Sequence, residues 1–116
     1  MGLSTHVLDT MHGCPAEHMH VELYSTAGQQ ATLIKTFDLN ADGRSDEPLF
    51  DDHELKTGTY RLTFDVKNYF LAYGVTLPEP AFLDRVNIDF GVANTTQHYH
   101  VPLLVSPWSY STYRGS

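Results

Sequence analysis

The stretch "YRLTFDVKNYFLAYG", residues 60–74, joins two hydrophobic patterns of different period. Its first half alternates apolar and polar residues, as expected of a strand with one buried face. The alternating apolar residues are Tyr60, Leu62, Phe64 and Val66. Its second half has apolar residues at mixed spacing and ends in Gly74, a residue type that often terminates a helix. The stretch therefore predicts a strand followed by one short helix at about residues 67–73.

The rest of the chain repeats the strand pattern between turn signals. "RVNIDFGV" (85–92) alternates in the same way, and weaker strand patterns occur in "STHVLD" (4–9), "HVELYS" (20–25) and "ATLIKTFDL" (31–39). Gly, Pro, Asn and Asp gather in the segments between them, as in "NADGR" and "LPEP". Many short strands with regular turns predict a mainly β sandwich or barrel. No repeat or linker is evident, so we expect residues 1–116 to form a single domain.

Length and charge restrict the possible functions. The 116 residues are few to enclose a deep active site alone, so a pocket made between subunits is expected. The net charge is -7, and the 7 basic residues are scattered, which argues against binding to nucleic acid. No apolar run approaches the roughly 20 residues needed to span a bilayer. We therefore expect neither nucleic acid nor membrane as a partner.

The first residues and the single cysteine bear on the cellular compartment. "MGLSTHVLDT" contains no basic segment followed by a hydrophobic one. This predicts a cytoplasmic protein, or a periplasmic one if a signal peptide was removed. Cys14 cannot form a disulfide within the chain, and we interpret it as a small buried residue rather than a reactive thiol.

Two of the seven histidines lie in "HYHVPLLV", residues 98–105. Strand alternation places His98 and His100 on one face of this segment. The opposite face carries Tyr99, Val101, Leu103 and Val105. Pro102 has no backbone N–H, which predicts an edge strand, a bulge or the wall of an opening. Crowded histidines indicate acid–base or metal chemistry, because histidine changes charge near neutral pH.

Three interpretations of these histidines remain open. They can be hydrogen-bonded surface or interface residues without a chemical task. They can bind a metal, because H-x-H occurs both at His18 with His20 and at His98 with His100, although no carboxylate or cysteine stands at a familiar ligand spacing. They can act as general bases toward water in metal-free hydrolysis. A serine nucleophile ranks below direct attack by water, because the chain has no GxSxG elbow.

Arg44 follows the turn pair Asp42-Gly43, so we expect its guanidinium to project from the start of a strand. Alone, such an arginine is a solvated surface charge. Beside a histidine, it would bind a planar, polar or anionic substrate and stabilise an oxyanion.

Three segments together resemble the 5-hydroxyisourate hydrolases, the enzymatic branch of the transthyretin superfamily. They are "STHVLD" near the start, "NADGR" in the middle and "HYHVPLLVSPWSYSTYRGS" (98–116) at the end. The similarity extends along essentially the whole chain, and "YRGS" is its most specific element, because transthyretin itself lacks this tetrapeptide. The resemblance implies a transthyretin-like two-sheet β-sandwich with one short α-helix. It also implies a homotetramer, a dimer of dimers with active sites at the dimer–dimer interface.

The resemblance further implies the site residues, by position. The catalytic residues are His6, Arg44 and His100. Substrate is bound by His6, Arg44, Tyr113 and Ser116, and the supporting residues are His98, Ser111, Arg114 and Gly115. Strand alternation puts Ser111 and Tyr113 on the same side of the last strand.

The implied reaction is hydrolysis of 5-hydroxyisourate to 2-oxo-4-hydroxy-4-carboxy-5-ureidoimidazoline in urate degradation. A histidine activates a water that attacks a ring amide carbonyl, and no metal or organic cofactor is needed. The sequence leaves open which histidine is the general base. The alternative is a transthyretin-like carrier of small molecules without catalysis.

Overall fold

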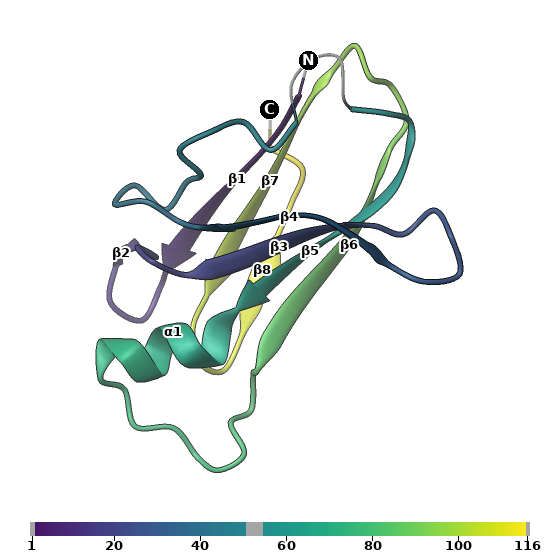
Figure 1. Ribbon diagram of the computed structural model, residues 1–116. Coiled ribbons are helices and arrows are strands. Elements are labelled where there is room, and N and C mark those ends of the chain that lie inside the picture. The colour runs from purple at the N-terminus through teal and green to yellow at the C-terminus, as the bar shows by residue number, and fades with distance from the viewer. Residues whose placement is uncertain (1, 51–54, 116) are drawn as a thin grey trace.

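The computed structural model describes residues 2–50 and 55–115, and this part of the chain forms two four-stranded sheets and one helix. The first sheet has the order β2-β1-β7-β8 and the second the order β4-β3-β5-β6. The strands are β1 (Gly2–Asp9), β2 (Cys14–Pro15), β3 (His20–Ser25), β4 (Thr32–Asp38), β5 (Gly58–Asp65), β6 (Arg85–Val92), β7 (His98–Val105) and β8 (Tyr110–Thr112). The helix α1 (Val66–Tyr73) lies at one end of the sheets (Figure 1). The predicted mainly β fold with one short helix is confirmed.

The core lies between the two sheets, where the alternating strands turn their apolar faces toward each other. The first sheet contributes Leu3, Val7, Leu103 and Val105, and the second contributes Val21, Leu23, Leu62 and Phe64, all at most 1% exposed. Burying each such side chain stabilises the fold by about 1.5–3 kcal/mol. The face of β7 that carries Tyr99 and Val101 is buried as predicted, so His98 and His100 are on the outward face.

The strand β1 pairs with β7 in parallel, although they are nearly a hundred residues apart in sequence. The register runs from Gly2 beside His98 to Asp9 beside Val105. Figure 1 shows the two strands side by side along their whole length. This pairing brings the histidines near the start of the chain next to those near its end.

Pro102 lies in an interior strand, because β7 is flanked by both β1 and β8, so the expectation of an edge strand is wrong. The pairing beside it is nevertheless interrupted. The strand β8 pairs with Leu103–Val105, and the next contact is an isolated bridge between His100 and Gly115. Across the gap, Thr112 donates its hydroxyl to the Pro102 carbonyl at 2.6 Å. The proline therefore occupies a break in the ladder, where no backbone donor is required.

The helix α1 begins and ends where its sequence requires. The Asp65 side chain accepts from the backbone N–H of Asn68, which caps the first turn. Gly74 has φ 100° and donates its N–H to Leu71, which closes the last turn in a conformation that favours glycine. The helix is one residue longer than the predicted 67–73.

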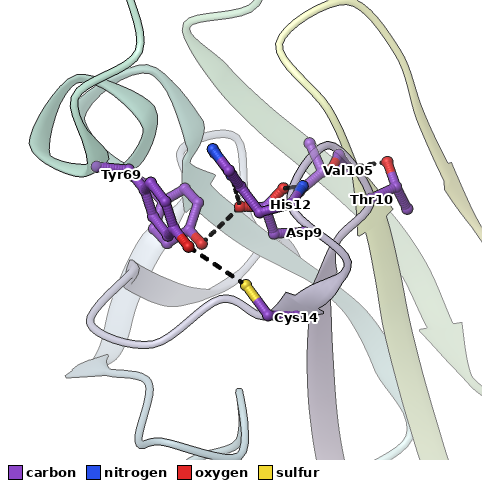
Figure 2. A network of polar contacts seen from close by, with 7 residues as sticks. Asp9, Thr10, His12, Cys14, Tyr69 and Val105 are labelled. Carbon is purple, nitrogen blue, oxygen red and sulfur yellow. Dashed lines mark hydrogen bonds and ion pairs between the residues drawn. The ribbon is translucent and has the colours of Figure 1, made fainter.

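A buried carboxylate joins α1 to the end of β1 (Figure 2). Asp9 is 1% exposed and accepts from the Tyr69 hydroxyl of α1 at 2.8 Å, and from the backbone N–H and ring Nδ1 of His12 at 3.0 and 2.6 Å. The His12 ring stacks on Tyr73, with 3.7 Å between centroids. Burial of a carboxylate is costly unless its oxygens are hydrogen-bonded, so these contacts fix where the helix docks.

Cys14 lies beside this network and is partly exposed, with its Sγ 3.9 Å from the Tyr73 hydroxyl. The interpretation of Cys14 as a buried residue is therefore only partly right.

Within residues 2–50 and 55–115, no helix is long and apolar enough to cross a membrane.

Candidate active site

The face of the β2-β1-β7-β8 sheet that points away from the core carries the predicted histidines. Along β1, Leu3, Thr5 and Val7 are buried, whereas Ser4 and His6 between them are only half-buried. Because β1 and β7 are parallel neighbours, side chains at paired positions stand next to each other on this outer face. The paired positions are Ser4 with His100 and His6 with Pro102.

Arg44 reaches this face from a tight loop rather than from a strand, so the expectation that it begins a strand is wrong. The Asn40 side chain accepts from the backbone N–H groups of Asp42 and Arg44 at 2.8 and 3.1 Å. The Gly43 carbonyl accepts from the N–H of Val7 in β1 at 2.9 Å. Gly43 has φ 74°, and a Cβ there would lie 2.5 Å from the Val7 carbonyl oxygen. Only glycine allows the loop to approach β1 this closely.

The loop places the Arg44 guanidinium against His6, with 3.4 Å between Nη2 and Nδ1. A guanidinium only donates hydrogen bonds, so in this contact His6 Nδ1 is the acceptor and the ring proton is on Nε2. Arg44 therefore lies beside a histidine and is not a lone surface charge. We refer to Ser4, His6, Arg44, His98 and His100 as the histidine cluster.

Ser4 connects the other two histidines of the cluster. Its Oγ lies 2.9 Å from His98 Nε2 and 2.7 Å from His100 Nδ1. The sequence interpretation did not include Ser4 among the site residues. Alternation along "STHVLD" places Ser4 on the same face as His6, but only the parallel pairing of β1 with β7 puts it beside His100.

Gly115 forms one wall of the His100 position. Its N–H donates to the His100 carbonyl at 2.8 Å, and a Cβ at Gly115 would lie 2.5 Å from His100 Cδ2. The ring therefore has Nδ1 against Ser4 and Cδ2 against Gly115, which leaves Nε2 free of both neighbours. This geometry suits a nitrogen that contacts water or substrate.

The surroundings of both histidines favour the neutral imidazole. Burial lowers the pKa of His6, and the positive charge of Arg44 adds to this effect, against a smaller opposing effect of Asp42. Burial also lowers the pKa of His100, followed by the charges of Arg44, His6 and His98. A neutral imidazole keeps a lone pair at neutral pH, which a general base requires.

The remaining predicted residues are distributed around the cluster. Ser111 pairs with Leu104 and therefore lies on the outer face with His98 and His100. Tyr113 follows the end of β8, is 62% exposed and lines a cavity together with Arg114 and Tyr99.

Arg114 points to the other side of the sheet and is not part of the histidine cluster. Its guanidinium lies 4.3 Å from the centroid of the Tyr99 ring, and it donates to Gln97 Oε1 at 2.9 Å. It also lines a cavity of about 240 Å³ between β6 and β8. Ser116 lies outside the described residues.

The metal interpretation receives no geometric support within residues 2–50 and 55–115. No group of three or more His, Cys, Asp or Glu side chains there is arranged to hold an ion. His20 of the first H-x-H pair instead contacts the carboxylates of Asp38 and Glu22, at 2.8 and 3.5 Å.

Known proteins resemble this chain over nearly its whole length. The 5-hydroxyisourate hydrolase of Pseudomonas aeruginosa is 54% identical over 98% of this chain and 90% of its own length. The crystal structure of an (S)-allantoin synthase superimposes with a TM-score of 0.93 at 45% identity, covering 99% of this chain, which spans 43% of that longer protein. Sea bream transthyretin, solved with thyroxine, has a TM-score of 0.86 at 26% identity, over 99% of this chain and 95% of its own.

The family profile described as "HIUase/Transthyretin family" matches residues 3–115, which include His6, His98, His100 and the loop of Arg44. Together with the identities above, this match shows that the chain belongs to the HIUase/Transthyretin family.

Proposed function

We propose that this protein is a 5-hydroxyisourate hydrolase, which converts 5-hydroxyisourate to 2-oxo-4-hydroxy-4-carboxy-5-ureidoimidazoline in urate degradation. The observation that carries the proposal is the histidine cluster, in which two histidines of lowered pKa lie near one arginine. Three bacterial relatives that are 52–54% identical to this chain support the same activity, because they are named as 5-hydroxyisourate hydrolases.

The geometry supports His100 as the general base. Its Nδ1 is engaged by Ser4, so Nε2 is the nitrogen available to take a proton from water. The water oxygen bonds to the ring amide carbon while its proton passes to His100 Nε2. The C–N bond then breaks, and the imidazolium returns the proton to the leaving nitrogen. His100 ends in its starting state, as a histidine does in other acyl transfers.

Arg44 and His6 act on the substrate rather than on the water in this scheme. The guanidinium stabilises the negative charge that develops on the carbonyl oxygen. His6 accepts from Arg44 at Nδ1, which orients the guanidinium over the sheet, and we assign His6 a contact with the substrate as well. No step requires a metal or an organic cofactor.

Residues 111–116 are assigned substrate-binding and supporting roles in the proposal. Tyr113 and Ser116 would bind substrate through their hydroxyls, and Gly115 supports His100 by its close approach. Ser111 supports the outer face beside Leu104. Arg114, stacked on Tyr99, supports the last segment from the other side of the sheet.

We further propose that residues 1–116 act as one domain within a homotetramer, with the sites at the dimer–dimer interface. The cluster lies on a half-exposed sheet face, and the adjacent segment exposes Trp108, Tyr110 and Tyr113 by 46–62%. A second subunit over this face would exclude water and complete the pocket. Cytoplasmic localisation stays a prediction from the sequence.

The test is ultraviolet absorbance of freshly generated 5-hydroxyisourate, which also decays without enzyme. Substoichiometric protein is expected to accelerate the decay through many turnovers and to do so equally after treatment with a chelator. Stoichiometric ligand binding without turnover would instead indicate a carrier. The carrier alternative is not favoured, because identity is 54% to the hydrolase and 26% to transthyretin.

A further inference from the structure

The hydroxyl of Ser4 lies between two histidines and has contacts with a nitrogen of each. The distances from Oγ are 2.9 Å to His98 Nε2 and 2.7 Å to His100 Nδ1, both within hydrogen-bonding range. Ser4 projects from β1 and the histidines from β7, at adjacent positions of the parallel pairing. The three side chains form a continuous hydrogen-bonded row on the outer face.

A serine hydroxyl has one proton to donate and two lone pairs that accept, so the row has three arrangements. In the first, His100 donates from Nδ1 to Ser4, and Ser4 donates to His98 Nε2. In the second, His98 donates from Nε2 to Ser4, and Ser4 donates to His100 Nδ1. In the third, both histidines donate to Ser4, and its proton points away from them. Neutral His100 carries its proton on Nδ1 in the first and third arrangements and on Nε2 in the second.

Catalysis by His100 requires an arrangement in which His100 donates from Nδ1, because a general base needs its lone pair at the nitrogen that meets water. With the proton on Nδ1, Nε2 is unprotonated, while Ser4 contacts the Nδ1 edge of the ring and Gly115 packs on the Cδ2 edge. With the proton on Nε2, that nitrogen can donate but cannot accept.

We propose that Ser4 is a positioning residue that holds His100 in its active tautomer, by donating its own proton to His98 Nε2 and accepting the His100 proton from Nδ1. The proposal rests on the proposed function, in which His100 is the base.

The other groups around His100 do not replace Ser4 in this role. The charges that act on the His100 ring come from Arg44 in the 40–44 loop, His6 of β1 and His98 of β7, all of them bases. Gly115, beyond β8, contacts His100 through its backbone N–H to the carbonyl and through close packing on the ring. The hydroxyl of Ser4 is therefore the group that faces Nδ1, and it determines which ring nitrogen is free.

The tautomer is tested directly by nitrogen-15 NMR of the histidine rings in the free protein above pH 7. Wild type is expected to carry the His100 proton on Nδ1, with an unprotonated Nε2, and Ser4→Thr is expected to keep this state because it keeps the hydroxyl. Ser4→Ala is expected to move the His100 proton to Nε2. An Nε2 proton on His100 in wild type, or no change in Ser4→Ala, would overturn the proposal.

Kinetics then test the effect on the reaction. Ser4→Ala is expected to lower kcat by about tenfold, a part of what a general base contributes, with little change in KM. Ser4→Thr keeps the hydroxyl and is expected to retain the kcat of wild type. Equal kcat in Ser4→Ala and wild type would contradict the proposed role of Ser4.

The two measurements separate this proposal from the proposed function. The NMR experiment needs no substrate, so it decides the tautomer even if the protein does not accelerate 5-hydroxyisourate decay. Failure of wild type in the decay assay would remove the hydrolase assignment while leaving the NMR result to stand alone.

Discussion

His100 is enclosed on two edges of its ring, by Ser4 and by Gly115, and meets positive charge from Arg44. These neighbours determine the orientation of the imidazole and favour its neutral form. A histidine on an ordinary strand face would have neither constraint. Predictions at the scale of single residues therefore concern the pKa and the position of this ring.

The first prediction concerns pH. Burial, and then the charge of Arg44, lower the pKa of His100 below its usual 6.5. The base therefore stays unprotonated in mildly acidic solution, and kcat/KM is expected to fall only when the pH drops through the lowered pKa. The kcat/KM profile of wild type measures this limb.

The Arg44→Ala variant provides the control, because it removes the nearby charge. The His100 ring in this variant is expected to titrate closer to 6.5, as followed by proton NMR of the imidazole. An acid limb at or above pH 6.5 in wild type would contradict this account of the site.

The second prediction concerns Gly115. A methyl group there would lie 2.5 Å from His100 Cδ2, so Gly115→Ala must displace the ring from Ser4. Misplacement of a reacting group by about 1 Å can cost about 10²-fold in rate, and we expect a loss of this size in kcat. The matched control is Gly28→Ala, where the nearest atom to a new Cβ is 3.8 Å away. Equal activity of the two variants would show that the His100 position does not depend on Gly115.

At the scale of elements, the end of β1 and the helix α1 depend on one buried carboxylate. Tyr69→Phe removes the hydroxyl that donates to Asp9, and a hydrogen bond to a charged group contributes about 1.5–3 kcal/mol. We expect the free energy of unfolding to fall by about this amount in urea denaturation, with the decay assay little changed.

Tyr73→Phe is the control for this prediction, because Tyr73 is 52% exposed and its hydroxyl makes a long 3.9 Å contact with Cys14. Its free energy of unfolding is expected to stay within about 0.5 kcal/mol of wild type. A loss of stability in Tyr73→Phe as large as in Tyr69→Phe would mean that the Asp9 contact is not what docks the helix.

The elements themselves were predictable because their signals are local. Alternation in "YRLTFDV" and the change of period before Gly74 depend on neighbours in sequence, and both β5 and α1 agree with them. The strand containing His98 and His100 was also predicted correctly, including which residues face the core.

The errors arose where pairing between distant segments decides the structure. Pro102 indicated an edge strand, a bulge or the wall of an opening, and the edge strand is wrong because β1 and β8 flank β7. The proline instead faces a break in the pairing with β8, which no local pattern reveals. Arg44 projects from a loop that is held by Asn40 and by the backbone of Val7, not from a strand. Ser4 was missed because it becomes a neighbour of His100 only when β1 and β7 pair in parallel.

At the scale of the whole molecule, the site lies on an open sheet face that one subunit does not cover. We expect a mass of four times the 13.1 kDa chain by light scattering at micromolar concentration. Dilution below the dissociation range is expected to lower the specific activity together with the mass, since the second dimer completes the pocket. Full specific activity in a sample that is monomeric by mass would contradict the assembly proposed here.

The central claim is that His100 is the base of a 5-hydroxyisourate hydrolase, and the most direct measurement is the rate of decay of freshly generated 5-hydroxyisourate followed by ultraviolet absorbance. Wild type is expected to accelerate the decay, and His100→Ala to lose about 10²–10⁴-fold of that acceleration while keeping the folded state and the mass of wild type. The control His20→Ala alters a histidine that contacts Asp38 and Glu22 outside the cluster, and it is expected to retain activity. Full acceleration by His100→Ala would contradict the account.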